Sequence, residues 1–408
     1  MGFRSIVDMG DAGESLRLYA ARGIASILCQ ENIRDSEWLD DRGFLTCIAM
    51  PLPPLSAIPP WVASLDDYEA LAEERVEAGA WAYLSGGAAD ESTLRGNRAA
   101  FERLKLSPRI FTDLSAASTA LNLFGRAYAH PIFIAPTAFH RIFHPEGELA
   151  TVLGASAMDT CLTVSTQAST AVEEIARGAT VPPWFQLYIQ PDRGFTAELV
   201  KRVEAAGCAA LVVTADAPLT GLRNREQRAM FRVPPGIESV NLRGMRTVPP
   251  ADRVFGSELL ATVPVWKDLE WLRSLTGLPI LLKGVLDPED AGIARDEGIS
   301  GIVVSNHGGR TLDTVPAAIE ALPRIAERLQ GSLPLLVDGG IRRGTDILKA
   351  LALGASGVMI GRPVLHGLAA AGATGVAHVL KILRTELEIA MALTGRPTLG
   401  DVDRSVLW

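Results

Sequence analysis

Residues 334–364 read PLLVDGGIRRGTDILKALALGASGVMIGRPV and contain two short apolar runs, PLLVD (334–338) and GVMIG (357–361). Neither run alternates apolar with polar residues, which is typical of strands buried on both faces. The segment between them, GTDILKALALG, has the pattern of a helix. A strand, a helix and a second strand in this order predict a βαβ unit with parallel strands.

Earlier runs of the same kind repeat this unit along the chain. They are PIFIAP (131–136), CLTVS (161–165), WFQLY (184–188), ALVVTA (210–215), PILLK (279–283) and GIVVS (301–305). Eight βα units in about 240 residues match the size of a (β/α)₈ TIM barrel, which is the α/β fold we expect. An open doubly wound sheet is the alternative, but it predicts G-x-G-x-x-G after the first strand, and none stands there. The long connection of residues 216–278 is expected to form a lid or a site wall.

The N-terminal part has a different character. PLPPLSAIPP (51–60) predicts an extended linker, so we divide the chain into a leader and linker, residues 1–62, and a barrel domain, residues 63–408. DDYEALAEERVEAGAWAYL (66–84) predicts one amphipathic helix, the start of an N-terminal helical extension. Residues 1–49 contain no histidine, which excludes a haem held there by two histidines. Whether this leader is an ordered, true part of the protein stays open.

The composition is that of a globular protein, with 48% hydrophobic and 21% charged residues among 408. A net charge of −8 argues against nucleic acid as the main partner, because polyanions bind basic surfaces. The four cysteines are far apart without a C-x-x-C pair, so we expect no disulfide framework and no metal site. No unbroken apolar run reaches 18 residues and no secretory signal opens the chain, so we expect a cytoplasmic protein that does not enter a membrane.

Polar residues follow almost every predicted strand, at the ends where barrel enzymes carry out their chemistry. A structural protein has no reason to place charged groups there, because desolvation is costly. The loops after strands seven and eight are the usual phosphate pocket of this fold, and DGGIRRG and IGRP supply free amides and arginines to them. The strand-end residues are Pro136, Thr137, Ala138, Ser165, Gln186, Tyr188, Thr214, Asp216, Lys283, Ser305, Asn306, His307, Asp338, Gly339, Gly340, Arg342, Gly361 and Arg362.

Some of these residues suggest a reaction. His307, in SNHGGRTLD, is a candidate base, and Asp216 is the natural partner to orient it. Arg223 and Arg310 offer two guanidinium groups that suit a substrate carboxylate. Lys283 is suited to form a Schiff base, to neutralise an anionic ring or to pair with a distant carboxylate. A base, two arginines, a lysine and a phosphate pocket together indicate an enzyme that removes hydrogen from a carboxylate-bearing substrate beside a phosphorylated cofactor.

Several stretches together carry a family resemblance: YLSGGAADESTLRGNRAAF, WFQLY, KGVLDPEDA, SNHGGRTLD and the segment 338–364. They resemble the FMN-dependent L-2-hydroxy-acid oxidases and dehydrogenases, a family that includes glycolate oxidase, lactate oxidase, lactate 2-monooxygenase, mandelate dehydrogenase and 4-hydroxymandelate oxidase. The resemblance runs from about residue 65 to the C-terminus. It implies a TIM barrel assembled as a homotetramer, FMN as cofactor, and oxidation of an L-2-hydroxy acid to the 2-oxo acid.

The resemblance also implies roles for individual residues. His307 matches the base, with Asp216 paired to it, and Tyr188 matches a tyrosine near the substrate oxygen. Arg223, Arg310 and Tyr83 match the groups that hold the substrate carboxylate. The cofactor contacts are matched by Pro136, Thr137, Ala138, Ser165, Gln186, Thr214 and Ser305 around the flavin, Lys283 beside its N1 and O2, and Asp338, Gly339, Gly340, Arg342, Gly361 and Arg362 along the ribityl chain and phosphate.

Departures from the family pattern leave the substrate open. Thr311 stands where the family usually has Gln, outside the proton-transfer set. Phe139 and Gln167 are expected to line the substrate pocket, and a polar Gln167 argues against glycolate. Lactate-like and mandelate-like acids are the candidates.

We expect O₂ as the electron acceptor, with H₂O₂ as the reduced product. Residues 232–262 are polar and interrupted by prolines, unlike the membrane-binding insertion of some family members. Ala138, where mandelate dehydrogenases tend to have Gly, points the same way. A soluble dehydrogenase that reduces a quinone or another acceptor, and an oxidative decarboxylation as in lactate 2-monooxygenase, are the alternatives.

Overall fold

The computed structural model describes residues 50–246 and 254–408, and their compact unit runs from Leu52 to Trp408. The predicted leader, residues 1–49, lies outside the described residues. The proline-rich stretch that follows it belongs to the compact unit by its contacts. The amide of Leu52 donates to the carbonyl of Glu74 (3.0 Å) and that of Leu55 to Ala370 (2.7 Å). The unit therefore begins about ten residues before the domain boundary that we placed after residue 62.

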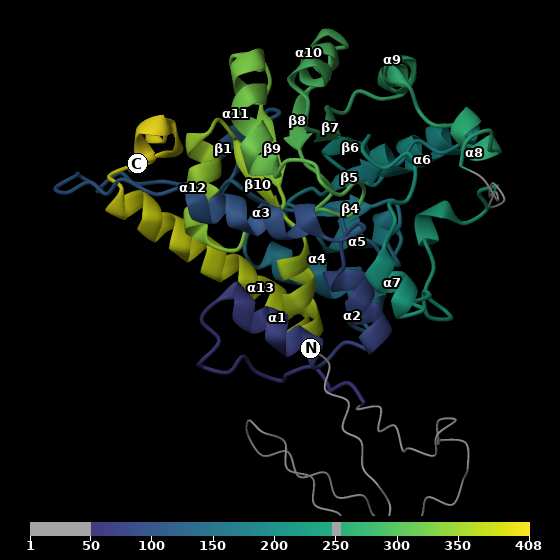
Figure 1. Cartoon of the computed structure of the whole chain (residues 1–408), viewed down its shortest axis with the longest axis horizontal. Helices are drawn as coiled ribbons and strands as arrows, with labels where there is room; N and C mark the ends of the chain where they lie inside the picture. Colours follow the sequence, from purple (N-terminus) through teal and green to yellow (C-terminus); the bar gives the residue numbers. More distant parts are fainter. Residues whose placement is uncertain (1–49, 247–253) are drawn as a thin grey trace, which may run out of the picture. The chain divides into compact units, whose positions relative to one another are not determined.

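Within the described residues, eight parallel strands form a barrel, hydrogen-bonded in the order β3-β10-β9-β8-β7-β6-β5-β4. A parallel bridge between Ile134 and Leu162 brings the two ends of the sheet together. The strands lie among the surrounding helices in Figure 1. The predicted (β/α)₈ TIM barrel is confirmed, and each of its strands overlaps a predicted run. The strands are β3 (Ile132–Ile134), β4 (Thr163–Ser165), β5 (Trp184–Leu187), β6 (Ala210–Thr214), β7 (Ile280–Val285), β8 (Gly301–Val304), β9 (Leu335–Asp338) and β10 (Gly357–Ile360).

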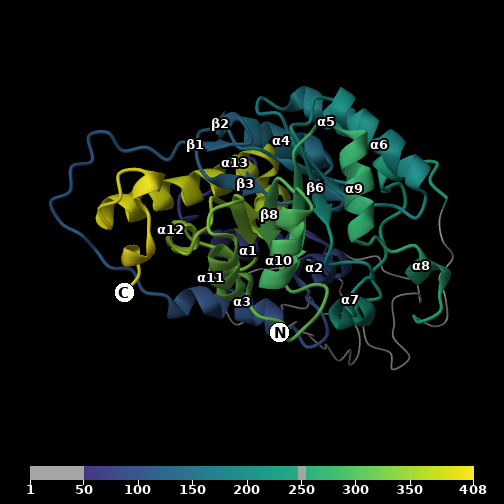
Figure 2. The same ribbon diagram turned by 90° about the horizontal axis from the view of Figure 1, so that it is seen from above.

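A helix follows each strand and covers the outside of the barrel (Figure 2). Local sequence explains where they begin, as at α10, where the Asp287 carboxylate accepts the amide hydrogen of Glu289 (2.7 Å) and Pro288 opens the helix. The helices are α4 (Gly147–Ser156), α5 (Val172–Gly178), α6 (Arg193–Ala205), α9 (Trp266–Leu275), α10 (Pro288–Asp296), α11 (Ala318–Leu329), α12 (Gly344–Ala352) and α13 (Arg362–Leu393).

The last helix, α13, is long and apolar enough to cross a membrane by length and composition alone. However, 78% of its most apolar window is buried within the fold. It also departs from helical geometry at Ala371 and Gly372, so it is two helical segments joined by a kink. These features are those of a core helix that packs against α4 and α1 (Leu65–Glu73).

The N-terminal extension is helical, but the prediction of one helix over residues 66–84 was wrong. The chain forms α1 (Leu65–Glu73) and a separate α2 (Ala78–Ser85), followed by α3 (Ser92–Arg103). Ser64 and Asp67 form a capping box that starts α1. The Glu77 carboxylate accepts the amide hydrogens of Gly79 (2.9 Å) and Ala80 (3.0 Å) and so starts a new helix. Glu77, which fits the polar face of one long helix, is therefore the N-cap of a second helix.

A short hairpin was not predicted from the sequence. Strands β1 (Leu121–Leu123) and β2 (Arg126–Tyr128) are antiparallel and precede the barrel. The hydroxyl of Tyr128 accepts the indole N–H of Trp184 (3.2 Å), and the Trp184 ring stacks on Phe133 at 4.7 Å. These aromatic rings fill the barrel at the end where the strands begin. The opposite end, where the strands finish, is left for a pocket.

The long connection between β6 and β7 contains α7 (Asn224–Arg228) and α8 (Glu258–Ala261) among its described residues. Short 3₁₀ helices lie there and elsewhere: η2 (His140–Ile142), η3 (Val240–Leu242), η4 (Leu399–Asp401) and η5 (Arg404–Val406). The segment between α3 and β1 extends away from the barrel near the C-terminus in both views (Figures 1 and 2).

Candidate active site

A pocket opens at the carboxyl ends of the strands and has an empty volume of about 1070 Å³, including its mouth. All but four of the residues that the sequence indicated at the strand ends or for the substrate line it. Asp216, Ser305, Asn306 and Phe139 do not, but Asp216 and Ser305 hydrogen-bond to residues that do. The indicated residues in the lining are Tyr83, Pro136, Thr137, Ala138, Ser165, Gln167, Gln186, Tyr188, Thr214, Arg223, Lys283, His307, Arg310, Asp338, Gly339, Gly340, Arg342, Gly361 and Arg362.

His307 and Asp216 form the central pair of the pocket. His307 Nδ1 lies 2.9 Å from Asp216 Oδ1. The His307 backbone has φ +58°, in the left-handed region, and its amide donates to Ser305 Oγ (3.0 Å). Such a conformation in a non-glycine residue is costly and is found where a side chain must be aimed. Burial raises the pKa of Asp216, but His307 and Lys283 lower it more, so the carboxyl is ionised at neutral pH.

Two arginines lie beside this pair. Arg310 Nη1 donates to the carbonyls of Tyr83 (2.8 Å) and Gly86 (2.7 Å), and its guanidinium lies 5.1 Å from the centre of the Tyr83 ring. Arg223 reaches the pocket from the loop after β6, and its Nε is buried without a hydrogen-bond partner among the described residues. A buried N–H without a partner is costly, which indicates a position for an anionic ligand.

The sequence did not indicate Glu226, which pairs with both arginines. Its position three residues after Arg223, on the same face of a helix, was the available signal.

The apolar residues of the pocket lining were also missed, because nothing in a single sequence separates them from the residues of the core. They are Leu84, Ala135, Ile341, Met359, Ile360, Pro363 and Leu365, together with Gly308.

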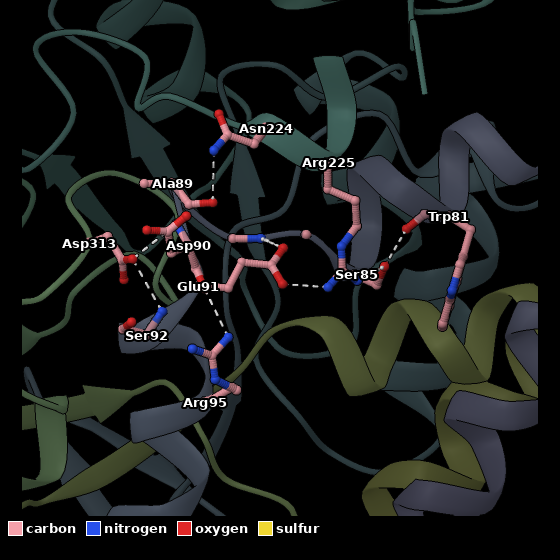
Figure 3. Close-up of polar contacts among 12 residues, drawn as sticks. Trp81, Ser85, Ala89, Asp90, Glu91, Ser92, Arg95, Asn224, Arg225 and Asp313 are labelled. Atoms are coloured by element: carbon pink, nitrogen blue, oxygen red, sulfur yellow. Dashed lines mark hydrogen bonds and ion pairs between the residues drawn. The ribbon is translucent and has the colours of Figure 1, made fainter. Parts of the chain in front are cut away.

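Tyr83 comes from α2, and a set of polar contacts ties the segment after that helix to the barrel loops (Figure 3). The Asp313 carboxylate accepts the amide hydrogen of Ser92 at the start of α3 (3.2 Å). Glu91 forms an ion pair with Arg225 of α7. Tyr83 is therefore held over the pocket from two neighbouring loops, those after β6 and β8.

Lys283 occupies the inner wall of the pocket. Its Nζ lies 3.0 Å from Asp338 Oδ2 and donates to Ser305 Oγ (2.9 Å). Burial would lower the pKa of Lys283, but the Asp338 and Asp216 carboxylates raise it above the usual value. A protonated amine is no nucleophile, so of the roles that the sequence left open, pairing with a distant carboxylate is the one that the structure shows. Lys283 adds a fixed positive charge to the wall.

A backbone irregularity aims Lys283. The register between β7 and β8 shifts between Lys283 and Val285. Gly284 at that shift has φ +104°, and a Cβ there would lie 2.4 Å from the Asp216 Cβ. Only glycine fits this bulge, which lets the backbone after Lys283 approach Asp216 in the loop after β6.

The polar floor of the pocket is formed by strands β4 to β6. Gln186 Nε2 donates to Thr214 Oγ1 (3.0 Å), and Ser165 Oγ donates to Gln186 Oε1 (3.3 Å). Burial raises the pKa of Tyr188 to about 12, so its hydroxyl is protonated and able to donate at neutral pH. Phe139, at the 3₁₀ turn after β3, lies outside the pocket lining, whereas Gln167 lies within it.

The loops after β9 and β10 form the end of the pocket that the sequence indicated for phosphate. Burial and the charge of Arg342 lower the pKa of Arg362 to about 9, which still leaves a cation at neutral pH. Arg362 Nη2 donates to the Gly308 carbonyl (2.6 Å), and Arg342 Nε is buried without a partner among the described residues. Gly340 has φ +85°, and a Cβ there would lie 2.2 Å from the Asn97 carbonyl oxygen. Two half-buried cations beside a bare glycine backbone suit a phosphate.

These features fit FMN. The phosphate would be held by Arg342 and Arg362. Asp338 Oδ1, buried without a partner in the described part of the chain, would accept a hydrogen bond from a ribityl hydroxyl. Lys283 would place its positive charge at the ring, and FMN, when bound, supplies acceptance of the substrate's two electrons.

A TIM barrel with a phosphate pocket at its last two loops, and a histidine–aspartate pair beside two arginines, defines a flavin-dependent oxidoreductase. Comparison with known proteins leads to the same class. The family described as FMN-dependent dehydrogenase matches residues 72–408. The chain is 46% identical to an L-lactate oxidase from Nostoc sp. over 355 residues, 84% of this chain and 97% of that protein. It is 43% identical to a glycolate oxidase from Spinacia oleracea over 351 residues, 84% and 95% of the two chains.

Among solved structures, a mandelate oxidase with (S)-2-phenylpropionate superposes with a TM-score of 0.78 at 41% identity, covering 85% of this chain and 98% of that one. The chain belongs to the FMN-dependent dehydrogenase family. The expected family and the cofactor FMN are confirmed, and the protein is an enzyme of that family.

Proposed function

We propose that the protein oxidises an L-2-hydroxy acid to the corresponding 2-oxo acid, with O₂ as the acceptor and H₂O₂ as the reduced product. The His307–Asp216 pair beside Arg223 and Arg310 is the observation that carries this proposal, because it joins a base to a carboxylate site within one pocket. Relatives named L-lactate oxidase, glycolate oxidase and mandelate oxidase support it.

The hydrogen bond of His307 decides which nitrogen acts as base. The Asp216 carboxylate only accepts, so His307 Nδ1 carries the proton of that hydrogen bond (2.9 Å). Nε2 is then the basic nitrogen, and it takes the proton from the substrate's hydroxyl or α-carbon. Asp216, ionised at neutral pH, stabilises the imidazolium that forms. The substrate loses two electrons and two protons in all, and O₂ takes up the same number to give H₂O₂.

Arg223 Nε and the Arg310 guanidinium would bind the substrate carboxylate, and the protonated Tyr188 hydroxyl would donate to a substrate oxygen. We propose a lactate-like or mandelate-like substrate. Gln167 and the apolar Leu84 and Ala138 line the pocket, so they would face a side chain larger than that of glycolate.

Anaerobic titration tests the substrate. A panel of L-2-hydroxy acids is added to the yellow enzyme, and the flavin absorbance at about 450 nm is followed. Bleaching by lactate or mandelate supports the proposal, and no bleaching by any 2-hydroxy acid contradicts it.

Reoxidation then tests the acceptor. Substrate-reduced enzyme is mixed with dissolved O₂ in a stopped-flow instrument, and H₂O₂ and the 2-oxo acid are measured. A reoxidation too slow to sustain turnover, with fast reduction of a quinone analogue, would indicate a dehydrogenase. Release of the decarboxylated acid in place of the 2-oxo acid would indicate a monooxygenase.

We also propose assembly as a homotetramer through an exposed apolar surface. Phe111 is fully exposed and Ile110 is 80% exposed on the segment between α3 and β1. The amide of Arg109 donates to the Leu393 carbonyl (3.1 Å), which places this segment beside the end of α13, where Leu393 is 64% exposed. Soluble proteins rarely leave such surface in water. Light scattering gives the mass, and a monomer would contradict the proposal.

A further inference from the structure

Glu226 lies between the two arginines of the proposed carboxylate site. Its Oε1 is 2.9 Å from Arg223 Nη1 and 3.2 Å from Arg310 Nη2. The side chain of Glu226 is 19% exposed, and those of Arg223 and Arg310 are 18% and 14% exposed, so the cluster is largely shielded from water. Because 84 positions separate Glu226 from Arg310, this contact joins the loop after β6 to the loop after β8.

The two arginines differ in what else holds them. Arg310 Nη1 is bound by two backbone carbonyls, those of Tyr83 and Gly86. For the side chain of Arg223, the described part of the chain supplies one polar partner only, Glu226, and its Nε is left buried and unpaired. Arg310 therefore keeps its place without Glu226, whereas Arg223 depends on it.

The local sequence aims Glu226 at this cluster. Arg223 precedes the short helix α7 and Glu226 lies three residues later, so the two side chains share one face. Figure 3 shows the neighbouring Asn224 and Arg225 reaching toward the segment after α2. Arg225 pairs with Glu91, and Asn224 Nδ2 donates to the Ala89 carbonyl (3.2 Å). These contacts fix α7 against the segment after α2 and so fix the direction of Glu226.

Charge explains why a carboxylate is needed there. Two guanidinium groups close together repel each other, and after burial the charge of Arg223 is the next largest influence lowering the pKa of Arg310. A shared acidic oxygen offsets that repulsion. It also occupies Arg223 Nη1, while Nε stays buried without a partner among the described residues and can donate to a ligand.

We infer that Glu226 is a positioning residue for carboxylate binding, which holds Arg223 against Arg310 so that Nε of Arg223 faces the ligand. This inference rests on the proposed function, because it assumes an anionic substrate at the two arginines. It assigns Glu226 no contact with the reacting atoms.

The test is a double-mutant cycle on the oxidised holoenzyme. The dissociation constants of benzoylformate and of its neutral amide are measured from the flavin absorbance change for wild type, Glu226→Ala, Arg223→Ala and the double variant. We expect Glu226→Ala to weaken benzoylformate on the order of 10- to 100-fold, as for the loss of a charge-assisted hydrogen bond. In the Arg223→Ala background the same change should cost less than about threefold. Binding of the amide should change little in either variant.

Further variants keep the outcome clear. Glu226→Gln retains an acceptor oxygen without the charge, so it should lie between wild type and Glu226→Ala. Glu238→Gln removes the exposed Glu238–Arg243 pair and is the matched control, with no expected effect.

Three outcomes would overturn the inference. Tighter benzoylformate binding in Glu226→Ala would show that Glu226 competes with the ligand. Unchanged binding, or additive effects in the double variant, would show that Glu226 does not act through Arg223. A wild type that is reduced by no 2-hydroxy acid and binds no benzoylformate would instead overturn the proposed function, and the inference with it.

Discussion

Nδ1 of His307 lies 2.9 Å from Oδ1 of Asp216, although 91 positions separate the two residues in the chain. The barrel makes this contact possible, because β6 and β8 both end at the pocket and β7 between them bulges at Gly284. The left-handed backbone of His307 is the conformational cost of this arrangement, and the bulge admits only glycine at position 284 because a Cβ there would lie 2.4 Å from the Cβ of Asp216. The cost falls at the residue that would act as base, which agrees with a catalytic role for the pair.

The variant His307→Gln should keep FMN but lose flavin reduction by substrate. Glutamine keeps polar atoms at the site yet cannot take a proton, so the rate should fall on the order of 10² to 10⁴-fold. Stopped-flow reduction under anaerobic conditions measures this rate, and the absorbance ratio of flavin to protein confirms cofactor content. Turnover at the wild-type rate would exclude His307 as the base.

Arg342→Ala and Arg362→Ala should weaken FMN retention more than substrate binding. Both arginines line the phosphate end of the pocket, and Arg342 Nε has no partner in the described residues. Loss of a charge-assisted contact to phosphate should lower FMN affinity at least about tenfold. Dialysis followed by flavin quantification measures the effect.

Arg343→Ala is the matched control for those two variants. Arg343 follows Arg342 directly, but its Nη1 donates to Glu386 (2.8 Å) outside the pocket. The Arg343→Ala variant should therefore retain its FMN. Stoichiometric FMN in the Arg342 and Arg362 variants, with raised Michaelis constants, would mean that these arginines serve the substrate.

For Lys283, the sequence predicted the position of the residue but not its partner. Its place after a buried apolar run predicted a strand-end position in the pocket, because the barrel puts all such ends together. Its partner could not be predicted, since Asp338 follows a different strand and only the order β9-β8-β7 brings the two within 3.0 Å. Glu226 was missed for a related reason, because its contact with Arg310 depends on the fold of a long loop. The break between α1 and α2 was missed because Glu77 fits a polar helix face and an N-cap equally well.

Deletion of residues 1–49 should leave a folded, yellow and active enzyme. Every residue that lines the pocket lies between Tyr83 and Leu365, and the described apolar core begins at Val62. Gel filtration, flavin content and turnover of the truncated protein test this. A longer deletion through residue 62 is the contrasting variant, because it removes Val62 and the hydrogen bond from Leu55 to Ala370 (2.7 Å), and it should lower thermal stability. An insoluble or flavin-free product from the shorter deletion would show that the barrel needs its leader.

Asp216→Asn should reveal a pH-dependent contribution of the His307 pair to stability. The pKa of Asp216 is lowered from 3.8 in the folded protein, because His307 and Lys283 outweigh the effect of burial. A lowered folded pKa means that the stabilisation is present above the unfolded value and is lost as pH falls through the folded value. Urea denaturation of the flavin-free wild type and variant between about pH 3 and about pH 8 should therefore show a difference of about 1 to 3 kcal/mol at neutral pH that shrinks below about pH 4. Asp296→Asn, at an exposed pair with Arg295, is the control and should show a much smaller trend, because water screens that pair. A difference that stays constant down to the acid end would mean that Asp216 acts through its shape and hydrogen bond, without its charge.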